Sequence, residues 1–159
     1  DICVLNTSYK GFGYKKDIHI WITSQDYENA NLMILLAYIL LGHPEWNKGI
    51  IKIFALYPSR IIEDQRQNLL ELIRTGRLPI APGNIELIPQ EANQDYKAII
   101  EQKSIDSDLT ITGFRDKDIK EGLELFSGFG DLGNILFVNA DKQKEIKDED
   151  IHKIIDILT

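Results

Sequence analysis

Apolar residues along the chain fall into short runs that are separated by longer segments with a helix-like pattern. The short runs are rich in β-branched and aromatic residues and are bounded by Gly, Pro, Asn or Asp, as is typical of strands. They are Ile2–Asn6, Ile18–Thr23, Ile50–Leu56, Asn84–Pro89, Ser107–Phe114 and Asn134–Ala140. The pattern therefore predicts strands distributed over the whole length of the chain.

The segments between these strands predict helices. Ala30–Gly42 is too long and too Leu-rich for a strand and is apolar almost all round, which predicts a buried helix that ends at Gly42 and Pro44. A second helix has Ser59 as its N-cap and Gly76 as its stop. The remaining predicted helices are Asp95–Ser104, Asp116–Phe129 and an amphipathic closing helix at Asp148–Leu158, whose apolar face carries Ile151, Ile154, Ile155 and Leu158.

Alternation of strands and helices is the pattern of a parallel sheet with helices on both faces. We therefore expect one α/β domain across residues 1–159, built as a doubly wound, mainly parallel sheet of about five strands. In such folds ligands bind beyond the carboxyl ends of the strands. The loops that follow Ile22, Leu56, Ile88 and Thr112 are therefore the places to look for a site.

Composition narrows the possible partners. The chain has 159 residues, of which 43% are hydrophobic and 27% are charged, as is typical of a soluble globular domain. Its net charge of −7 argues against a nucleic-acid partner, because phosphates need a basic surface. Cys3 is the only cysteine, which excludes an intrachain disulfide, and we expect it to be a small buried hydrophobe.

The sequence contains no segment long enough to cross a bilayer. Its longest apolar run, Leu32–Leu41, has ten residues, whereas a membrane-spanning helix needs about twenty. The chain begins at Asp1 without an initiator Met. We interpret it as a domain cut from a longer protein or as a processed protein.

Thr23, Ser24, Gly113 and Arg115 follow two of the predicted strands and are the candidate residues for a nucleotide cofactor. A phosphate cradle needs several glycines, and the chain has no Walker A motif. The stretch "GFGDLG", which begins at Gly128, has the spacing of a dinucleotide fingerprint. It precedes a strand instead of following one, so we interpret it as a loop.

Arg115 is able to clamp a phosphate, but Asp116 and Asp118 follow it and would repel one. The interpretation that the sequence favours is an ion pair between Arg115 and one of these aspartates, or an Arg115 side chain in water.

No catalytic residue, metal ligand or bound cofactor is predicted. His19 lies inside an apolar run and is interpreted as a residue of the core or of the sheet face. His43 lies at a helix end, and His152 lies in the closing helix. The three histidines are far apart and have no zinc-site spacing, and no Ser, His and Asp grouping follows from the strand ends.

Several stretches of the sequence together carry a family resemblance. They are Lys15–Lys16, Ile18–Ile22, Asn31–Leu41 and Pro44–Trp46, followed later by "SDLTITGF" and "NILFVNADKQKEI". The sequence resembles the last cytoplasmic segment of the cation-chloride cotransporter family. In that family a basic pair leads into an Ile-Asp-x-Trp-Trp strand, which a Leu-Met-x-Leu-Leu-Ala-Tyr-Leu-Leu helix and a Pro-Glu-Trp turn follow.

The resemblance implies the last cytoplasmic subdomain of a longer membrane transporter, with a regulatory or assembly role and no catalytic activity. It implies a fold similar to the universal stress protein, a homodimer, and contact with the transmembrane domain of the same transporter. The protein would then lie on the cytoplasmic side of the membrane as part of an integral membrane protein.

The chain departs from the family pattern at two places. His19 stands where the family strand has Asp, and Asp116 stands where a nucleotide-binding universal stress protein would carry the second glycine of G-x-x-G after Gly113. The alternative hypothesis, an ATP- or nucleotide-binding module of the universal stress type, stays open on the strength of the strand-end candidates. A small hydrolase ranks last, because the sequence offers no nucleophile beside a base.

Overall fold

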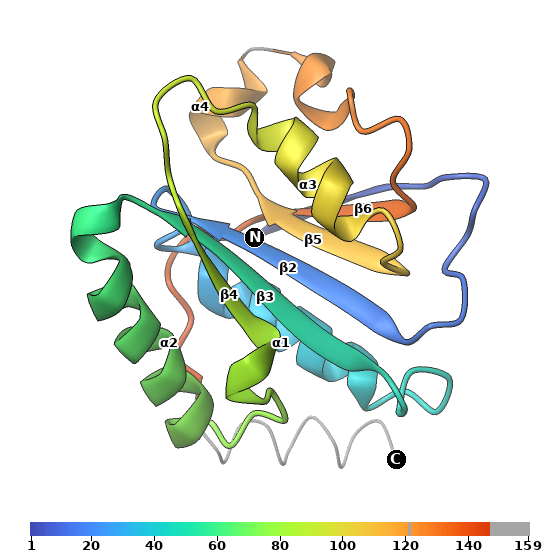
Figure 1. Ribbon diagram of the computed structural model, residues 1–159. Helices are drawn as coiled ribbons and strands as arrows, with labels where there is room; N and C mark the ends of the chain where they lie inside the picture. The colour runs from blue at the N-terminus through green and yellow to red at the C-terminus, as the bar shows by residue number, and fades with distance from the viewer. Residues whose placement is uncertain (121, 147–159) are drawn as a thin grey trace.

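The computed structural model describes residues 1–120 and 122–146, which form a six-stranded sheet flanked by helices (Figure 1). Across the sheet the strands follow the order β1-β6-β5-β2-β3-β4. β1 runs antiparallel to β6, and every other pairing is parallel. The strands are β1 (Ile2–Asn6), β2 (Asp17–Thr23), β3 (Ile50–Tyr57), β4 (Ile85–Pro89), β5 (Leu109–Gly113) and β6 (Asn134–Asn139). The predicted mainly parallel sheet is confirmed, with six strands where about five were expected.

The helices cover both faces of the sheet, as predicted. They are α1 (Asn29–Leu41), α2 (Ile62–Thr75), α3 (Tyr96–Ser104) and the short α4 (Asp116–Ile119). α1 and α2 pack on one face, and α3 lies on the opposite face together with a 3₁₀ turn at Leu123–Phe126 (Figure 1). The doubly wound arrangement is therefore present within the described residues.

The side chains of β2 point alternately to the two faces of the sheet and contribute to the hydrophobic core on each face. Ile18, Ile20 and Ile22 point to the face of α1 and α2, whereas Trp21 points to the face of α3. Trp21 lies opposite Phe54 in the parallel register, and the two rings stack with their centroids 4.5 Å apart. Because these side chains are almost completely buried, β2 is the central strand of two separate hydrophobic layers.

α1 and α2 match their predictions, apart from one cap. α1 ends at Leu41 with Gly42 as its C-cap, and α2 ends with Gly76 as its C-cap, both as predicted. The prediction of Ser59 as an N-cap is wrong. Ser59 begins a 3₁₀ turn that carries the chain to Ile61, and α2 starts only after that turn without a side-chain cap.

The predicted helix over Asp116–Phe129 is also wrong. α4 ends at Ile119, and a 3₁₀ turn follows at Leu123–Phe126. Gly122 lies between them with φ of +89°, a left-handed conformation that no α-helix contains. The segment instead lays Phe126 against Phe137 of β6, with ring centroids 4.9 Å apart.

Cys3 is exposed, which contradicts the expectation of a buried residue. The prediction failed because β1 is an edge strand of the sheet, which leaves this side chain uncovered. The predicted closing helix at Asp148–Leu158, which carries His152, lies outside the described residues. Among the helices of residues 1–120 and 122–146, none has the length and apolar character needed to span a membrane.

Candidate functional site

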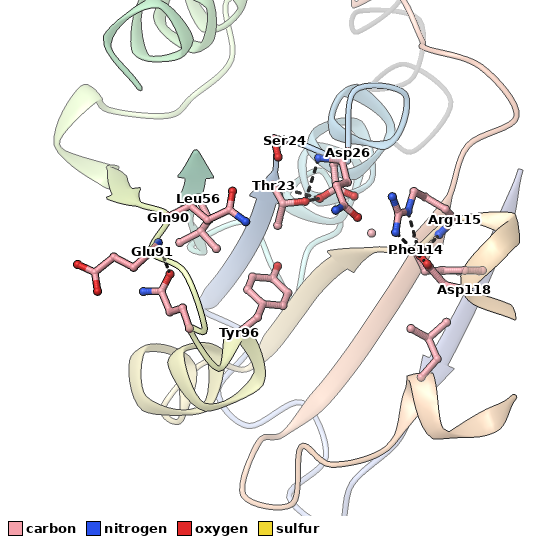
Figure 2. Close-up of a pocket in the computed structure, with 14 residues that line it drawn as sticks. Thr23, Ser24, Asp26, Leu56, Gln90, Glu91, Tyr96, Phe114, Arg115 and Asp118 are labelled. Atoms are coloured by element: carbon pink, nitrogen blue, oxygen red, sulfur yellow. Dashed lines mark hydrogen bonds and ion pairs between the residues drawn. The ribbon is translucent and has the colours of Figure 1, made fainter. Parts of the chain in front are cut away.

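A pocket of about 290 Å³ opens at the carboxyl ends of the parallel strands. All four sequence candidates, Thr23, Ser24, Gly113 and Arg115, line it. Figure 2 shows Thr23 and Tyr96 in its middle, with Gln90 and Glu91 on one side and Arg115 and Asp118 on the other. The four candidates thus lie together at one pocket, as expected for residues that follow neighbouring parallel strands.

Asp26 is the central polar residue of this pocket, although it is not among the candidate residues selected from the sequence. Its side chain is only 4% exposed. The Asp26 carboxylate accepts hydrogen bonds from the backbone N–H and the hydroxyl of Thr23, both at 2.8 Å, and from the Asn29 amide at 3.1 Å. The sequence signal was an acid three residues after a strand-end threonine, just before a helix.

Burial dominates the electrostatics of Asp26. Desolvation raises the pKa of this carboxyl above its usual value, because burial penalises the charged form. The hydrogen bonds from Thr23 and Asn29 and the positive charge of Arg115 oppose that shift. The Asp26 carboxyl is therefore buried, and neighbouring protein groups supply its hydrogen bonds in place of solvent.

The position of the Asp26 side chain requires a glycine at position 113. A Cβ atom at this position would lie 1.8 Å from Asp26 Oδ1 and 2.7 Å from Asn29 Nδ2. Both distances are far below van der Waals contact, so only a residue without a side chain fits there. Gly113 therefore allows the Asp26 carboxylate to approach the end of β5, and its role is in packing.

Two asparagines extend the polar network to β6. Asn29 donates to the carbonyl of Phe114 at 3.0 Å and accepts from the N–H of Ala140 at 2.8 Å. Asn139 donates to the same Phe114 carbonyl at 3.0 Å. The start of α1 and the ends of β5 and β6 are consequently joined by buried hydrogen bonds, which fix their relative positions.

Arg115 is committed to Asp118, as the sequence interpretation favoured. The guanidinium contacts both carboxylate oxygens, Nε to Oδ2 at 3.2 Å and Nη2 to Oδ1 at 2.9 Å. The backbone N–H of Arg115 also donates to Asp118. The hydrogen bond from the guanidinium is the main cause that lowers the pKa of the Asp118 carboxyl below its usual value.

Acidic side chains also lie near the helix starts around the pocket. Asp26 precedes α1, Asp118 caps the first turn after β5, and Asp95 caps α3 by accepting from the N–H of Ala98 at 3.2 Å. Helix starts are the positions at which a phosphate would normally bind. Carboxylates cap the starts of α3 and α4, whereas the start of α1 has no side-chain cap, because the Asp26 carboxylate bonds to Thr23 and to the Asn29 side chain. The acidic groups around the pocket make it poorly suited to a polyphosphate.

His19 lies on the face of the sheet, as predicted, and it does not line the pocket. Its Nδ1 is 2.8 Å from the Ser104 hydroxyl, which also accepts from Trp21 Nε1 at 2.9 Å. Burial, with a smaller contribution from Lys52, lowers the pKa of His19 to about 4. Ser104 is completely buried, so this serine and histidine cannot act on a substrate.

The other sequence candidates have structural roles. His43 follows the end of α1, and its Nδ1 accepts from the N–H of Glu45 at 3.2 Å. The "GFGDLG" stretch is a loop that leads into β6, as interpreted, and Gly128 has φ of +83° in it. In the part of the chain that the structure describes, no three His, Cys, Asp or Glu side chains are grouped so that they could hold a metal ion.

The geometry defines a doubly wound α/β domain whose strand-end pocket is lined by the Arg115–Asp118 ion pair and the buried Asp26 carboxylate. No protein-family model matches the chain, and no curated protein matches it by sequence. Its fold is similar to that of a solved structure described as the cytoplasmic domain of a prokaryotic cation chloride cotransporter, with a TM-score of 0.53 and 21% sequence identity. The match covers 92% of this chain and 55% of that one, so this chain spans about half of the solved domain.

Proposed function

We propose that the chain is a non-catalytic cytoplasmic regulatory or assembly domain of a membrane transporter of the cation-chloride cotransporter type. The observation that carries the proposal is the fold similarity to such a cytoplasmic domain across 92% of the chain. It agrees with the resemblance in the sequence, whose most distinctive parts are α1 and the turn at Pro44–Trp46.

Mechanical coupling is the mode of action that fits this domain. Buried hydrogen bonds join α1 to the ends of β5 and β6, so that this part of the fold moves as one body. Contacts of such a body with the transmembrane domain of the same transporter, or with a second copy, would bias the transporter between its states.

The arrangement of charges supports a role without catalysis. Around the pocket, Asp26 is bonded to Thr23 and Asn29, and Arg115 is paired with Asp118. General acid–base catalysis needs a titratable group within reach of a substrate. These groups are instead engaged with one another.

The genomic and functional tests are direct. The reading frame upstream of this chain is expected to encode about ten to twelve hydrophobic spans of about twenty residues each. Removal of the domain from that transporter should change the rate of ion flux in reconstituted vesicles. A gene without hydrophobic spans, or a flux unchanged by the deletion, would contradict the proposal.

Self-association is the assembly part of the proposal. Sedimentation equilibrium of the 159-residue chain at high micromolar concentration should give a dimer mass, and the same measurement on the chain joined to its transmembrane domain should agree. A monomer in both measurements would exclude a homodimer.

The alternative function, binding of ATP or another nucleotide, has one favourable observation. Thr23, Ser24, Gly113 and Arg115 do line a single pocket. However, the Asp26 carboxylate lies against Gly113, and the Arg115 guanidinium is already paired with Asp118. We therefore expect sub-millimolar ATP with Mg²⁺ to leave the melting temperature unchanged, and a rise of several degrees would favour the alternative.

A further inference from the structure

The two outer edges of the sheet differ in how well they are protected from a further strand. At one edge, β4 carries Glu86, whose carboxylate pairs with Lys52 and Lys103, and the strand ends in Pro89. Charged side chains and proline keep an edge strand from pairing with another chain. At the other edge, β1 has the sequence Ile-Cys-Val-Leu-Asn, with neither a charge nor a proline. Among the described residues, β1 is therefore the sheet edge that is open to one more strand.

The strand register identifies the backbone groups of β1 that point away from the sheet. The Val138 carbonyl of β6 accepts from the N–H of Phe114, so Val138 directs its backbone groups toward β5. Because these directions alternate along a strand, Leu136 also turns away from β1. Cys3 and Leu5 lie opposite Val138 and Leu136, so they form the non-hydrogen-bonded pairs with β6. The N–H and C=O groups of Cys3 and Leu5 consequently point outward, beyond the edge of the sheet.

Apolar side chains of β1 are uncovered on both faces of the sheet. Ile2 is 47% exposed and Leu5 is 46% exposed, and Cys3 is exposed as well. Val4 packs on the hydrophobic layer beside α3, so Ile2 shares that face, whereas Cys3 and Leu5 lie on the opposite face. A strand added at this edge would cover apolar surface on both faces, in addition to pairing the backbone.

We propose that β1 pairs antiparallel with β1 of a second copy of this chain, around a two-fold axis at Val4. In this register Cys3 lies opposite Leu5 of the second copy, and all the outward backbone groups of both residues form hydrogen bonds across the seam. A register centred on Cys3 would place Leu5 opposite Asp1, outside β1, and a register centred on Leu5 would place Cys3 opposite Thr7, also outside β1. The register at Val4 therefore satisfies the most groups within the strand.

A second copy is the partner that the edge itself fits. An antiparallel pair of identical strands is self-complementary, as a two-fold dimer requires. Asp1 lies opposite Thr7 of the second copy, so no two carboxylates face each other, whereas a parallel pair would place the two Asp1 side chains side by side. The seam rests on the assembly part of the proposed function and adds to it the surface through which the two copies meet.

Disulfide formation tests the register. The two Val4 residues form a non-hydrogen-bonded pair across the seam, with Cα atoms about 4.5 Å apart, which a disulfide can span. The variant Cys3→Ser/Val4→Cys of the 159-residue chain should therefore give a covalent dimer on a non-reducing gel after mild oxidation at high micromolar concentration. The variant Cys3→Ser/Gln102→Cys has its cysteine at an exposed position of α3, and as the control it should stay monomeric on the same gel.

Sedimentation equilibrium tests the contribution of the edge to the affinity. Leu5→Lys places a charge at the seam in both copies, so the dissociation constant of the dimer should rise about tenfold or more. The fold should survive, because the Leu5 side chain is about half exposed. Ile50→Lys is the matched control and should leave the affinity unchanged, since Ile50 is 52% exposed and lies on β3, with three strands between it and β1.

The outcomes separate the seam from the assembly role. A dimer that Leu5→Lys leaves unchanged, or the absence of the covalent dimer, would overturn the β1 seam while the assembly role stands. A monomeric unaltered chain at high micromolar concentration would also overturn the seam. The assembly role itself fails only when the chain joined to its transmembrane domain is monomeric too.

Discussion

At the scale of single residues, the contact between Gly113 and Asp26 organises the carboxyl edge of the sheet. A methyl group at position 113 would overlap the Asp26 carboxylate and the Asn29 amide, both of which are buried and hydrogen-bonded. Relief of this overlap requires Asp26 to move away from Thr23, which would leave buried polar groups unsatisfied.

Gly113→Ala is therefore expected to lower the free energy of unfolding by about 2–4 kcal/mol, from overpacking and from lost hydrogen bonds. Urea denaturation followed by circular dichroism measures the change. Gly83→Ala is the matched control, because no atom lies within 4 Å of its Cβ position. A Gly113→Ala variant as stable as the Gly83→Ala variant would contradict the packing role of Gly113.

His19 gives the protein a pH dependence whose sign follows from its burial. The folded state holds the pKa of His19 near 4, below the ordinary value of 6.5. Stability from the neutral imidazole is therefore fully present above pH 6.5 and is lost as the pH falls toward 4. The loss is on the order of 2–3 kcal/mol, since one pKa unit corresponds to about 1.4 kcal/mol.

The measurement is the free energy of unfolding at a series of pH values for the unaltered chain and for His19→Gln. The variant should lack the part of the acid-side decline that His19 causes, whereas His43→Gln, at an exposed helix end, should keep it. Parallel curves for the unaltered chain and His19→Gln would show that His19 does not titrate differently on folding.

At the scale of elements, Gly122 explains why the segment after β5 is not one helix. Its φ of +89° ends the helical path, and its Cβ position meets no atom within 4 Å. Gly122→Ala should therefore destabilise the fold by about 1–2 kcal/mol through backbone strain alone. Gly130→Ala has the same open surroundings without a positive φ, so it should be nearly neutral in the same urea titration. Equal stability of the two variants would contradict the strain argument.

The elements that the sequence predicted correctly are those whose pattern is local. The β-branched runs and the apolar helix at α1 carry their periodicity in consecutive residues, so their positions were predictable. The end of α4 and the cap of α2 depend on backbone conformation and on packing of residues distant in sequence. Charge and periodicity across Asp116–Phe129 contain no sign that Phe126 packs on β6.

The candidate site shows the same division. Thr23, Ser24, Gly113 and Arg115 were predictable, because strand ends meet at one edge of a parallel sheet. The sequence places Asp26 after a strand-end threonine but does not reveal its burial, which depends on β5 and β6 closing over the start of α1. A pattern of residues along one segment cannot report which side chain two other segments will cover.

At the scale of the whole molecule, the two hydrophobic layers share their strands. Trp21 reports on the layer beside α3, and Trp46 lies in the layer beside α1 and α2. Because β2 and β3 contribute to both layers, neither can lose its packing while the other keeps its own. We expect the two layers to unfold in a single transition.

Trp21→Phe and Trp46→Phe each leave one tryptophan as a fluorescent reporter of one layer. In each variant the fluorescence midpoint in urea should coincide with the midpoint from circular dichroism. Trp21→Phe is expected to be the less stable variant, because it removes a buried hydrogen bond to Ser104, whereas Trp46→Phe removes only an edge contact with Phe12. Separate midpoints for the two probes within one variant would show that the layers unfold independently.

The pairing of β1 with β6 has a consequence for synthesis on the ribosome. Ile2 lies opposite Asn139, so β1 leaves the exit tunnel before the other strands and meets its neighbour β6 only after they have been translated. Contacts so distant along the chain are slow to form. During translation the nascent chain can assemble its five parallel strands first, and the opening segment, with its apolar Ile2 and Leu5, must wait unpaired until that assembly is finished.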